Sequence, residues 1–309
     1  MWPNRCESAG RWCESMISSS SKSNPTGSNE SRPASGEASA TKHAAADYPQ
    51  ALERLPTAEL ASGSYRLRFA RTAEDLDAVL KLRFQVFNLE LNEGLASSYA
   101  TGRDEDEFDR GCHHLVVEHA PTREVVGTYR IQTLEMSGGV AGLYTAGEYD
   151  LSRFPQEILA ESVELGRACI DREHRKKPVL FLLWRGLALY VAWNRKRYLF
   201  GCCSITSQDP NDGWRAFAQL DGGGHLRQDV VVGAMPGYEC ERSDLATESA
   251  PIELPPLFDI YLRFGGKICG PPVIDRAFRT IDFFMLFDVM AMEERSRKMF
   301  FDGLPAGVP

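Results

Sequence analysis

The pattern of apolar and polar positions divides the chain into a polar N-terminal segment and one larger domain. Residues 1–62 contain few large apolar side chains and are rich in Ser, Ala, Asn and Gly. Such a segment buries too little apolar surface to offset its chain entropy. We therefore expect residues 1–62 to be disordered, apart from a short helix near residues 48–55. An ordered domain over residues 63–300 and a flexible C-terminus over residues 301–309 complete the expected organisation.

Within the domain, the apolar positions switch between a period of two, which predicts strands, and a helical period. The predicted strands cover residues 64–70, 112–120, 124–134, 161–170 and 198–206, with further extended segments in 267–289. The predicted helices cover residues 72–91, 178–196, 210–220 and 254–266, and a short helix ends the Gly-rich connection at 138–158. This order predicts a mixed α/β (α+β) domain without the strict alternation of a doubly wound sheet.

Composition and charge limit the classes of partner. The net charge of −8 argues against a general affinity for nucleic acid. The eight cysteines contain no CxxC pair, so we expect neither a metal site nor a disulfide framework. The N-terminus has no continuous apolar core typical of a signal peptide, and the chain fits the reducing cytoplasm.

The most apolar run of the sequence covers Val179–Trp193. It is shorter than the ~18–20 residues that a membrane-spanning helix needs, and it contains Arg185. We expect a buried helix here. Peripheral contact of this helix with the inner membrane is the alternative.

A basic loop precedes this apolar helix. Its cations are Arg172, Arg175, Lys176 and Lys177. The N-terminus of a helix presents unpaired N–H groups and a partial positive charge, which suit a phosphate group. A charge run by itself is more often a solvated loop. The position of this run, between a strand and an apolar helix, favours phosphate binding.

Two further groups of charged residues are candidates for chemistry. Glu164 and Arg167 lie three residues apart on a predicted strand, so they face opposite sides unless a bulge intervenes. An acidic loop contains Asp104, Asp106 and Asp109. This loop could attract a cationic substrate, be solvated, or pair with the basic run Arg172–Lys177.

Four motifs that occur in order resemble those of the acyl-homoserine-lactone synthases, a branch of the GNAT acyltransferase fold. The motifs are RFQVF, DEDEFD, VVGTYRI and ELGR. The segments from ELGR to residue 190, and those near residues 254–289, look more like the ornithine–acyl carrier protein N-acyltransferases and long-chain N-acyl amino acid synthases. The resemblance covers about residues 65–292 and implies a GNAT-like fold, a central mixed twisted sheet flanked by helices.

The resemblance also implies roles for single residues. Glu164, Arg167 and Arg130 match positions that line the acyl-transfer site. The matched substrate-binding positions are Arg83, Phe87, Asp104, Asp106 and Asp109. The acidic motif begins with Asp104 where the lactone synthases have Glu, and Gly166 replaces a serine. These departures favour plain N-acylation.

The implied reaction moves a long-chain acyl group to the α-amine of an amino acid such as ornithine. The donor is acyl-phosphopantetheine on acyl carrier protein, with acyl-CoA as an alternative, and no permanent cofactor is implied. Glu164 is the candidate base, and a bulge near Leu165–Arg167 would supply oxyanion donors. Phe181, Leu182, Trp184 and Leu187 are candidates for an acyl tunnel, although core packing is the commoner role at helical spacing.

Two other functions are compatible with the same residues. One is a lactone-type signal synthase, which would require S-adenosylmethionine. The other is a non-catalytic GNAT-like module that binds acyl carrier protein or lipid.

Overall fold

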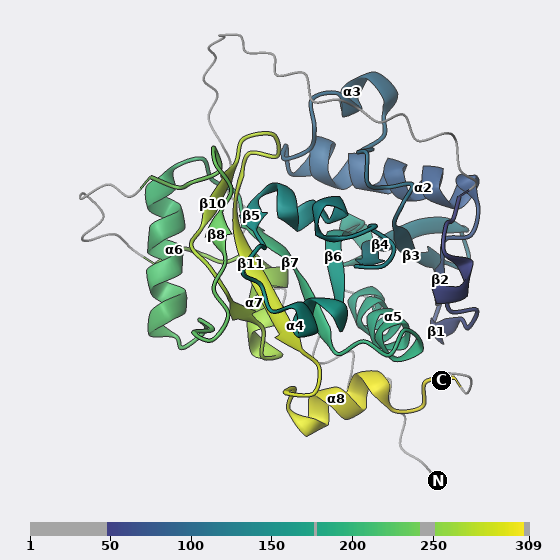
Figure 1. The fold of residues 1–309 in the computed structure, drawn as a ribbon. Coiled ribbons are helices and arrows are strands. Elements are labelled where there is room, and N and C mark those ends of the chain that lie inside the picture. Colours follow the sequence, from purple (N-terminus) through teal and green to yellow (C-terminus); the bar gives the residue numbers. More distant parts are fainter. Residues whose placement is uncertain (1–47, 176–177, 242–250, 306–309) are drawn as a thin grey trace.

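The computed structural model describes residues 48–175, 178–241 and 251–305. They form the mixed α/β fold that the sequence predicts (Figure 1). The strands are β1 (Leu60–Ser62), β2 (Tyr65–Phe69), β3 (His113–His119), β4 (Glu124–Thr133), β5 (Tyr149–Asp150), β6 (Ser162–Ile170), β7 (Tyr198–Ile205), β8 (Gly233–Ala234), β9 (Lys267–Ile268), β10 (Val273–Asp275) and β11 (Thr280–Asp288). The α-helices are α2 (Ala73–Arg83), α3 (Ser98–Thr101), α4 (Gln156–Ala160), α5 (Val179–Trp193), α6 (Pro210–Gly222), α7 (Pro256–Arg263) and α8 (Glu294–Phe301).

Shorter helical segments complete the fold. The predicted helix over residues 72–91 is α2 followed by a π-helical segment, η2 (Phe84–Glu90). Thr72 caps the start of α2 by accepting a hydrogen bond from the Asp75 backbone N–H. The 3₁₀ segments are η1 (Leu52–Arg54), η3 (Val140–Gly142), η4 (Tyr144–Gly147) and η5 (Arg172–His174).

One large sheet organises the domain, in the strand order β1-β2-β3-β4-β6-β7-β11-β10, with β9 pairing β11. Its neighbouring strands are antiparallel except for β6 and β7, which are parallel. Helix α5 makes the crossover between these two strands, as a parallel pair requires. Strands β5 and β8 form a separate small sheet.

Helices α2 and α5 cover opposite faces of this sheet (Figure 1). On β3, Leu115 and Val117 pack in the cluster that contains the apolar side of α5, whereas Val116 packs with Val79 of α2. Alternate residues of a strand point to opposite faces, which places the two helices on different sides. The buried helix predicted over Val179–Trp193 is therefore confirmed as α5.

The ordered domain extends beyond both boundaries expected from the sequence. Strand β1 pairs with β2, and Leu55 and Leu60 are buried in the main core. At the other end, Leu304 packs against the same core. The expected boundaries at 62 and 301 are therefore wrong. The reason is that these few apolar residues stand in mainly polar segments, whose average composition does not reveal them. The predicted disorder of residues 1–47 lies outside the described residues.

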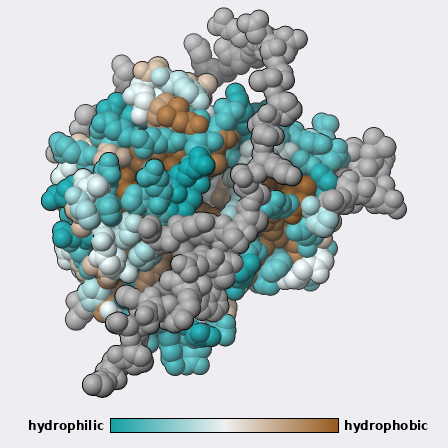
Figure 2. All heavy atoms as spheres, turned by 180° about the vertical axis from the view of Figure 1, so that it is seen from behind, coloured by the Kyte–Doolittle hydropathy of each residue, from teal (hydrophilic) through white to brown (hydrophobic). Residues whose placement is uncertain are grey.

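Among the residues that the structure describes, no helix is long and apolar enough to cross a membrane. The face shown in Figure 2 carries separate apolar patches between hydrophilic side chains. Two exposed leucines, Leu89 and Leu91, lie at the end of η2.

Candidate functional site

Strands β6 and β7 separate after a short paired stretch. They pair only from Ser162 opposite Tyr198 to Glu164 opposite Phe200. Beyond this point β6 continues with β4, and β7 continues with β11. Within the described residues, the edge of β6 that faces β7 therefore has no strand partner from Leu165 onward.

A glycine stands where the two strands part. A Cβ atom added to Gly201 would lie 2.2 Å from the backbone oxygen of Leu165. No real Cβ atom approaches a carbonyl oxygen so closely, so only glycine allows this contact between the strands. The opening thus begins at a position that the sequence specifies.

A bulge in β6 lies beside the opening. The pairing with β4 shifts register between Thr128 and Arg130, opposite Gly166–Cys169. Arg167 adopts a positive φ of 48° there, a conformation that L side chains rarely take. The spacing of Glu164 and Arg167 alone predicted opposite faces, and the structure shows the bulge that was the stated exception. Because it changes the alternation along β6, Glu164 and Arg167 lie on the same face of the sheet, the face covered by α2.

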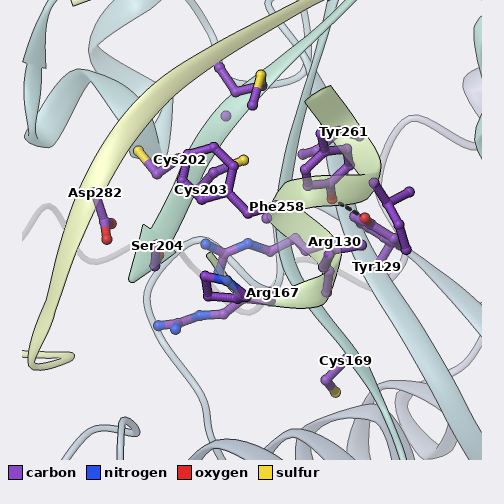
Figure 3. A pocket seen from close by; sticks show the side chains of 18 of the residues that line it. Tyr129, Arg130, Arg167, Cys169, Cys202, Cys203, Ser204, Phe258, Tyr261 and Asp282 are labelled. Carbon is purple, nitrogen blue, oxygen red and sulfur yellow. Dashed lines mark hydrogen bonds between the residues drawn. The ribbon is translucent and has the colours of Figure 1, made fainter. Parts of the chain in front are cut away.

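A cavity of about 460 Å³ fills the space between the separated strands (Figure 3). This volume lies within the range typical of ligand sites. Its apolar wall comes from β6, β7, α5 and α7, and includes Leu165, Ala168, Leu183, Trp184, Phe258 and Tyr261. Its polar residues include Arg130, Arg167, Tyr144, Ser204, Glu93 and Asp282.

Only one of the four α5 residues predicted for an acyl tunnel lines this cavity, and it is Trp184. Leu182 and Leu187 are buried in the main core, and Phe181 packs against Phe300 with ring centroids 6.0 Å apart. The core interpretation holds for these three. Phe87, which the resemblance placed at the substrate, does line the cavity.

A buried ion cluster joins the acidic loop to the arginines of the motifs. Arg83 is fully buried and donates from Nε to Asp104 Oδ1 at 2.8 Å and from Nη1 to Asp109 Oδ1 at 2.5 Å. Arg130 donates from Nη1 to both carboxylate oxygens of Asp106 at 2.6 Å and to Asp109 Oδ1 at 3.1 Å. The acidic loop is thus neutralised by arginines inside the protein. These partners, Arg83, Arg130 and Arg167, do not belong to the basic run Arg172–Lys177, which was the pairing considered from the sequence.

The charges in this cluster control the ionisation of its carboxyls. Burial alone would raise the pKa of Asp109, but the Arg83 and Arg130 guanidinium groups outweigh burial and hold that pKa well below its usual range. The same balance lowers the pKa of Asp106, where Arg130 is the main cation. Both carboxylates therefore remain ionised and hold Arg130 in place.

Arg167 is held less completely than its neighbours. Its Nε lies 3.6 Å from Asp104 Oδ1, and its Nη2 lies 3.5 Å from Asp106 Oδ2. Both nitrogens are buried and have no hydrogen-bond partner. The guanidinium carbon lies 3.6 Å from the ring centroid of Phe278, a favourable cation–π distance. Arg167 therefore presents unused donors beside the cavity.

Glu164 is placed differently from what its expected role as a base requires. It is buried, and its carboxylate accepts hydrogen bonds from Gln132 Nε2 at 2.6 Å, from Tyr144 N at 3.1 Å and from Thr145 N at 2.8 Å. It is not among the cavity-lining residues. In this arrangement Glu164 anchors the turn that carries Tyr144, whose ring lies 5.3 Å from the Arg130 guanidinium carbon.

The cavity reaches the basic loop at the start of α5. Arg175 and Leu180 both line it. Arg175 makes a double hydrogen bond to Glu90, at 2.6 and 2.7 Å. Arg172 lies in η5 and is exposed, whereas Lys176 and Lys177 lie outside the described residues.

Sequence reasoning missed the two carboxylates that line the cavity, Glu93 and Asp282. Glu93 follows η2, and its side chain contacts Thr206. Burial raises the pKa of Glu93. Asp282 interrupts the otherwise apolar run of β11, and this interruption was the signal in the sequence that could have identified it.

Comparison with known proteins identifies the family. Residues 82–185 match the family model described as an acetyltransferase (GNAT) domain. The chain is 32% identical to an L-ornithine N(alpha)-acyltransferase of Brucella abortus over 75% of this chain and 87% of that protein. It is 31% identical to the enzyme of the same name from Rhizobium meliloti over 72% of this chain and 79% of that protein.

The chain belongs to the L-ornithine N(alpha)-acyltransferase family. It is an N-acyltransferase with a GNAT domain, as the motifs indicated. Among solved structures, a CoA-dependent acyl-homoserine lactone synthase matches with a TM-score of 0.43 and 13% identity, covering 76% of this chain and 85% of that chain.

Replacing the central arginine of the ion cluster tests its structural role in this N-acyltransferase. Arg83→Leu would leave Asp104 and Asp109 buried without their main cation, so we expect the free energy of unfolding to fall by about 3–5 kcal/mol. Urea denaturation measures the change. Arg110→Leu is the control, because this exposed arginine should contribute less than about 0.5 kcal/mol. A loss below about 1 kcal/mol for Arg83→Leu would contradict the role.

Disturbing the close approach at which β6 and β7 begin to part tests its role in activity. Gly201→Ala would push the strands apart at the Leu165 carbonyl, and we expect kcat/KM for acyl transfer to fall on the order of 100-fold through misplacement of the site. Gly222→Ala is the matched control, because no atom lies within 4 Å of its added Cβ. Equal activity of the two variants would show that the close approach is not needed.

Proposed function

We propose that this chain transfers a long-chain fatty acyl group from an acyl-phosphopantetheine thioester to the α-amine of L-ornithine, giving a lyso-ornithine lipid. The observation that carries the proposal is the opening between β6 and β7. It brings together an apolar cavity, an unpaired strand edge and three arginines. The names of two relatives that are 31–32% identical support ornithine as the acceptor.

The unpaired edge of β6 suits the donor. The phosphopantetheine arm contains two amide groups, which can pair with a free strand edge as an added strand would. Its phosphate would then rest at the start of α5, near Arg172 and Arg175, where the helix dipole favours an anion. The basic loop also suits docking of an acidic acyl carrier protein, and acyl-CoA carries the same arm.

The apolar wall suits the acyl chain. Leu183 and Trp184 of α5 line the cavity together with Phe258 and Tyr261 of α7, and the rings of Trp184 and Tyr261 lie 5.7 Å apart. A fatty chain can leave water against these side chains. Leu91 lines the cavity and is itself exposed, next to exposed Leu89. These two leucines support peripheral contact with the inner membrane, where an amphipathic product would be delivered.

Acyl transfer forms one bond and breaks another. The neutral α-amine of ornithine attacks the thioester carbonyl, an amide C–N bond forms, and the C–S bond breaks to release the thiol. The bulge at Gly166–Arg167 frees backbone N–H groups for the developing oxyanion, each contributing about 3–4 kcal/mol in comparable sites. Glu93 is the base we propose, because it faces the cavity and burial raises its pKa towards neutrality.

Incubation with defined substrates tests the function. The full chain receives palmitoyl acyl carrier protein or palmitoyl-CoA with L-ornithine, and fragment-ion mass spectrometry locates the acyl group. We expect an ornithine-dependent product acylated on the α-nitrogen. A product that forms only with S-adenosylmethionine, or no N-acylation of any amino acid with either donor, would contradict the proposal.

Two glutamine variants separate the candidate bases. We expect Glu93→Gln to lower kcat by roughly 100-fold or more and to remove the rise in rate that accompanies deprotonation of Glu93 as pH increases. Glu164→Gln places an amide against backbone N–H donors, so it should lower the free energy of unfolding by about 1–3 kcal/mol. If Glu164→Gln instead abolishes the same limb of the pH–rate profile with unchanged stability, Glu164 is the base.

A further inference from the structure

Three buried carboxyl groups lie close together, and one of them, Asp282, lines the cavity. They belong to Glu148, which follows η4, to Asp275 at the end of β10, and to Asp282 on β11. Glu148 is 3% exposed, and the two aspartates are each 4% exposed. The side-chain ligand atoms of Glu148, Cys202 and Asp282 all lie within 4.8 Å of one another. Cys202 donates from Sγ to Glu148 Oε2 at 3.2 Å.

This acidic group differs from the Arg83 cluster because its charge is not balanced. Within residues 48–175, 178–241 and 251–305, no ion pair joins Glu148, Asp275 or Asp282 to a cation. Buried carboxylates are normally paired with a cation or neutralised by a proton. A ligand that brings a positive charge would complete this group.

An unused acceptor atom at the cavity wall points to such a ligand. Asp282 lines the cavity, and its Oδ1 is buried without a hydrogen-bond partner. Its neighbour across the strand pair is Ser204, which also lines the cavity, as does Cys202 (Figure 3). An unsatisfied buried acceptor is costly, and a donor in the cavity would remove this cost.

The unused donors of Arg167 lie close to the same end. Phe278, whose ring lies against the Arg167 guanidinium, donates its backbone N–H to Asp275 Oδ1 at 3.0 Å. Tyr144 lies between the two groups, with its ring 6.0 Å from Arg167 and its hydroxyl 3.5 Å from Asp275 Oδ2. At this end the cavity therefore offers the unused donors of Arg167 and the carboxyl group of Asp282 to a single small molecule, with Glu148 close to Asp282.

We propose that Asp282, supported by Glu148, binds the side-chain ammonium of a diamino acid acceptor while Arg167 binds its α-carboxylate. This assignment rests on the proposed N-acylation of ornithine and names the residues that select its side chain. With both ends held, the α-amine is the one nucleophile left to meet the thioester. A neutral amino acid of the same length would leave the carboxylates without their cation.

The ionisation of the acidic group agrees with a site for a cation. Burial raises the pKa of Asp282 to about 6, and the charge of Asp275 acts in the same direction. Burial, followed by the charges of Asp282 and Asp275, raises the pKa of Glu148 well above its usual value. The group thus retains a proton when no cation is near, and an ammonium would replace it.

Binding of two amino acids that differ only at the terminal nitrogen tests the assignment. L-ornithine and L-norvaline share a carbon skeleton, and norvaline lacks the side-chain amine. We expect the full chain to bind ornithine roughly 10- to 100-fold more tightly in titration calorimetry, the range for a charge-assisted contact. Asp282→Asn and Glu148→Gln should each reduce this preference at least several-fold and leave norvaline binding unchanged. Asp221→Asn, an exposed position on α6, should keep the full preference.

Several outcomes overturn the assignment. Equal binding of ornithine and norvaline by the wild type would do so, as would a preference that survives in either folded variant. Zinc binding that depends on Asp282, with an unchanged ornithine preference, would assign the group to a metal instead. Turnover is scored separately: acylation of ornithine and norvaline at equal rates removes this inference but keeps the proposed function. An ornithine preference in binding without any acylated product would keep this inference and remove the proposed function.

Discussion

The separation of β6 and β7 is the constraint on which the rest of the site depends. A strand edge that is paired with a neighbouring strand cannot bind a substrate backbone, so the two strands must part while the sheet stays intact. The close approach of Gly201 to the Leu165 carbonyl sets where they part. The bulge beyond it changes which side chains face α2, and this change brings Arg167 to the face that already holds Arg130.

Two electrostatic environments lie on either side of this opening, and they have different consequences. In the cluster around Arg83, arginines balance the buried aspartates, so the carboxylates are ionised and the guanidinium groups are fixed. Around Asp282, buried carboxyls have no such partners among the described residues, and the pKa values of Asp282 and Glu148 are raised. Balanced charge makes the first environment a support for the strands, whereas unbalanced charge makes the second suitable for a cationic substrate.

The sequence predicted what depends on local pattern, and it missed what depends on contacts between distant segments. Periodicity identified α5 and the order of the helices and strands along the chain. The three-residue spacing of Glu164 and Arg167 by itself predicted opposite faces, and the bulge that places them on one face depends on the pairing with β4. The sequence pattern could not show that a turn 20 residues earlier would donate a backbone hydrogen bond to the Glu164 carboxylate. Asp282 was hidden for a similar reason, because its importance comes from Glu148 on a different segment. Leu55 and Leu60 follow a Ser-rich segment, so the composition gave no sign of them. They belong to the core because they pack in one cluster with residues of β2 and α5.

A crystal structure with a non-hydrolysable acyl-phosphopantetheine analogue tests the central claim most directly. An analogue whose thioester is replaced by a ketone keeps the arm, the acyl chain and the carbonyl oxygen. The account predicts that the arm lies between β6 and β7, that the carbonyl oxygen faces the bulge at Gly166–Arg167, and that the acyl chain contacts Trp184. An arm bound elsewhere on the protein, with the opening between the strands unchanged, would contradict it.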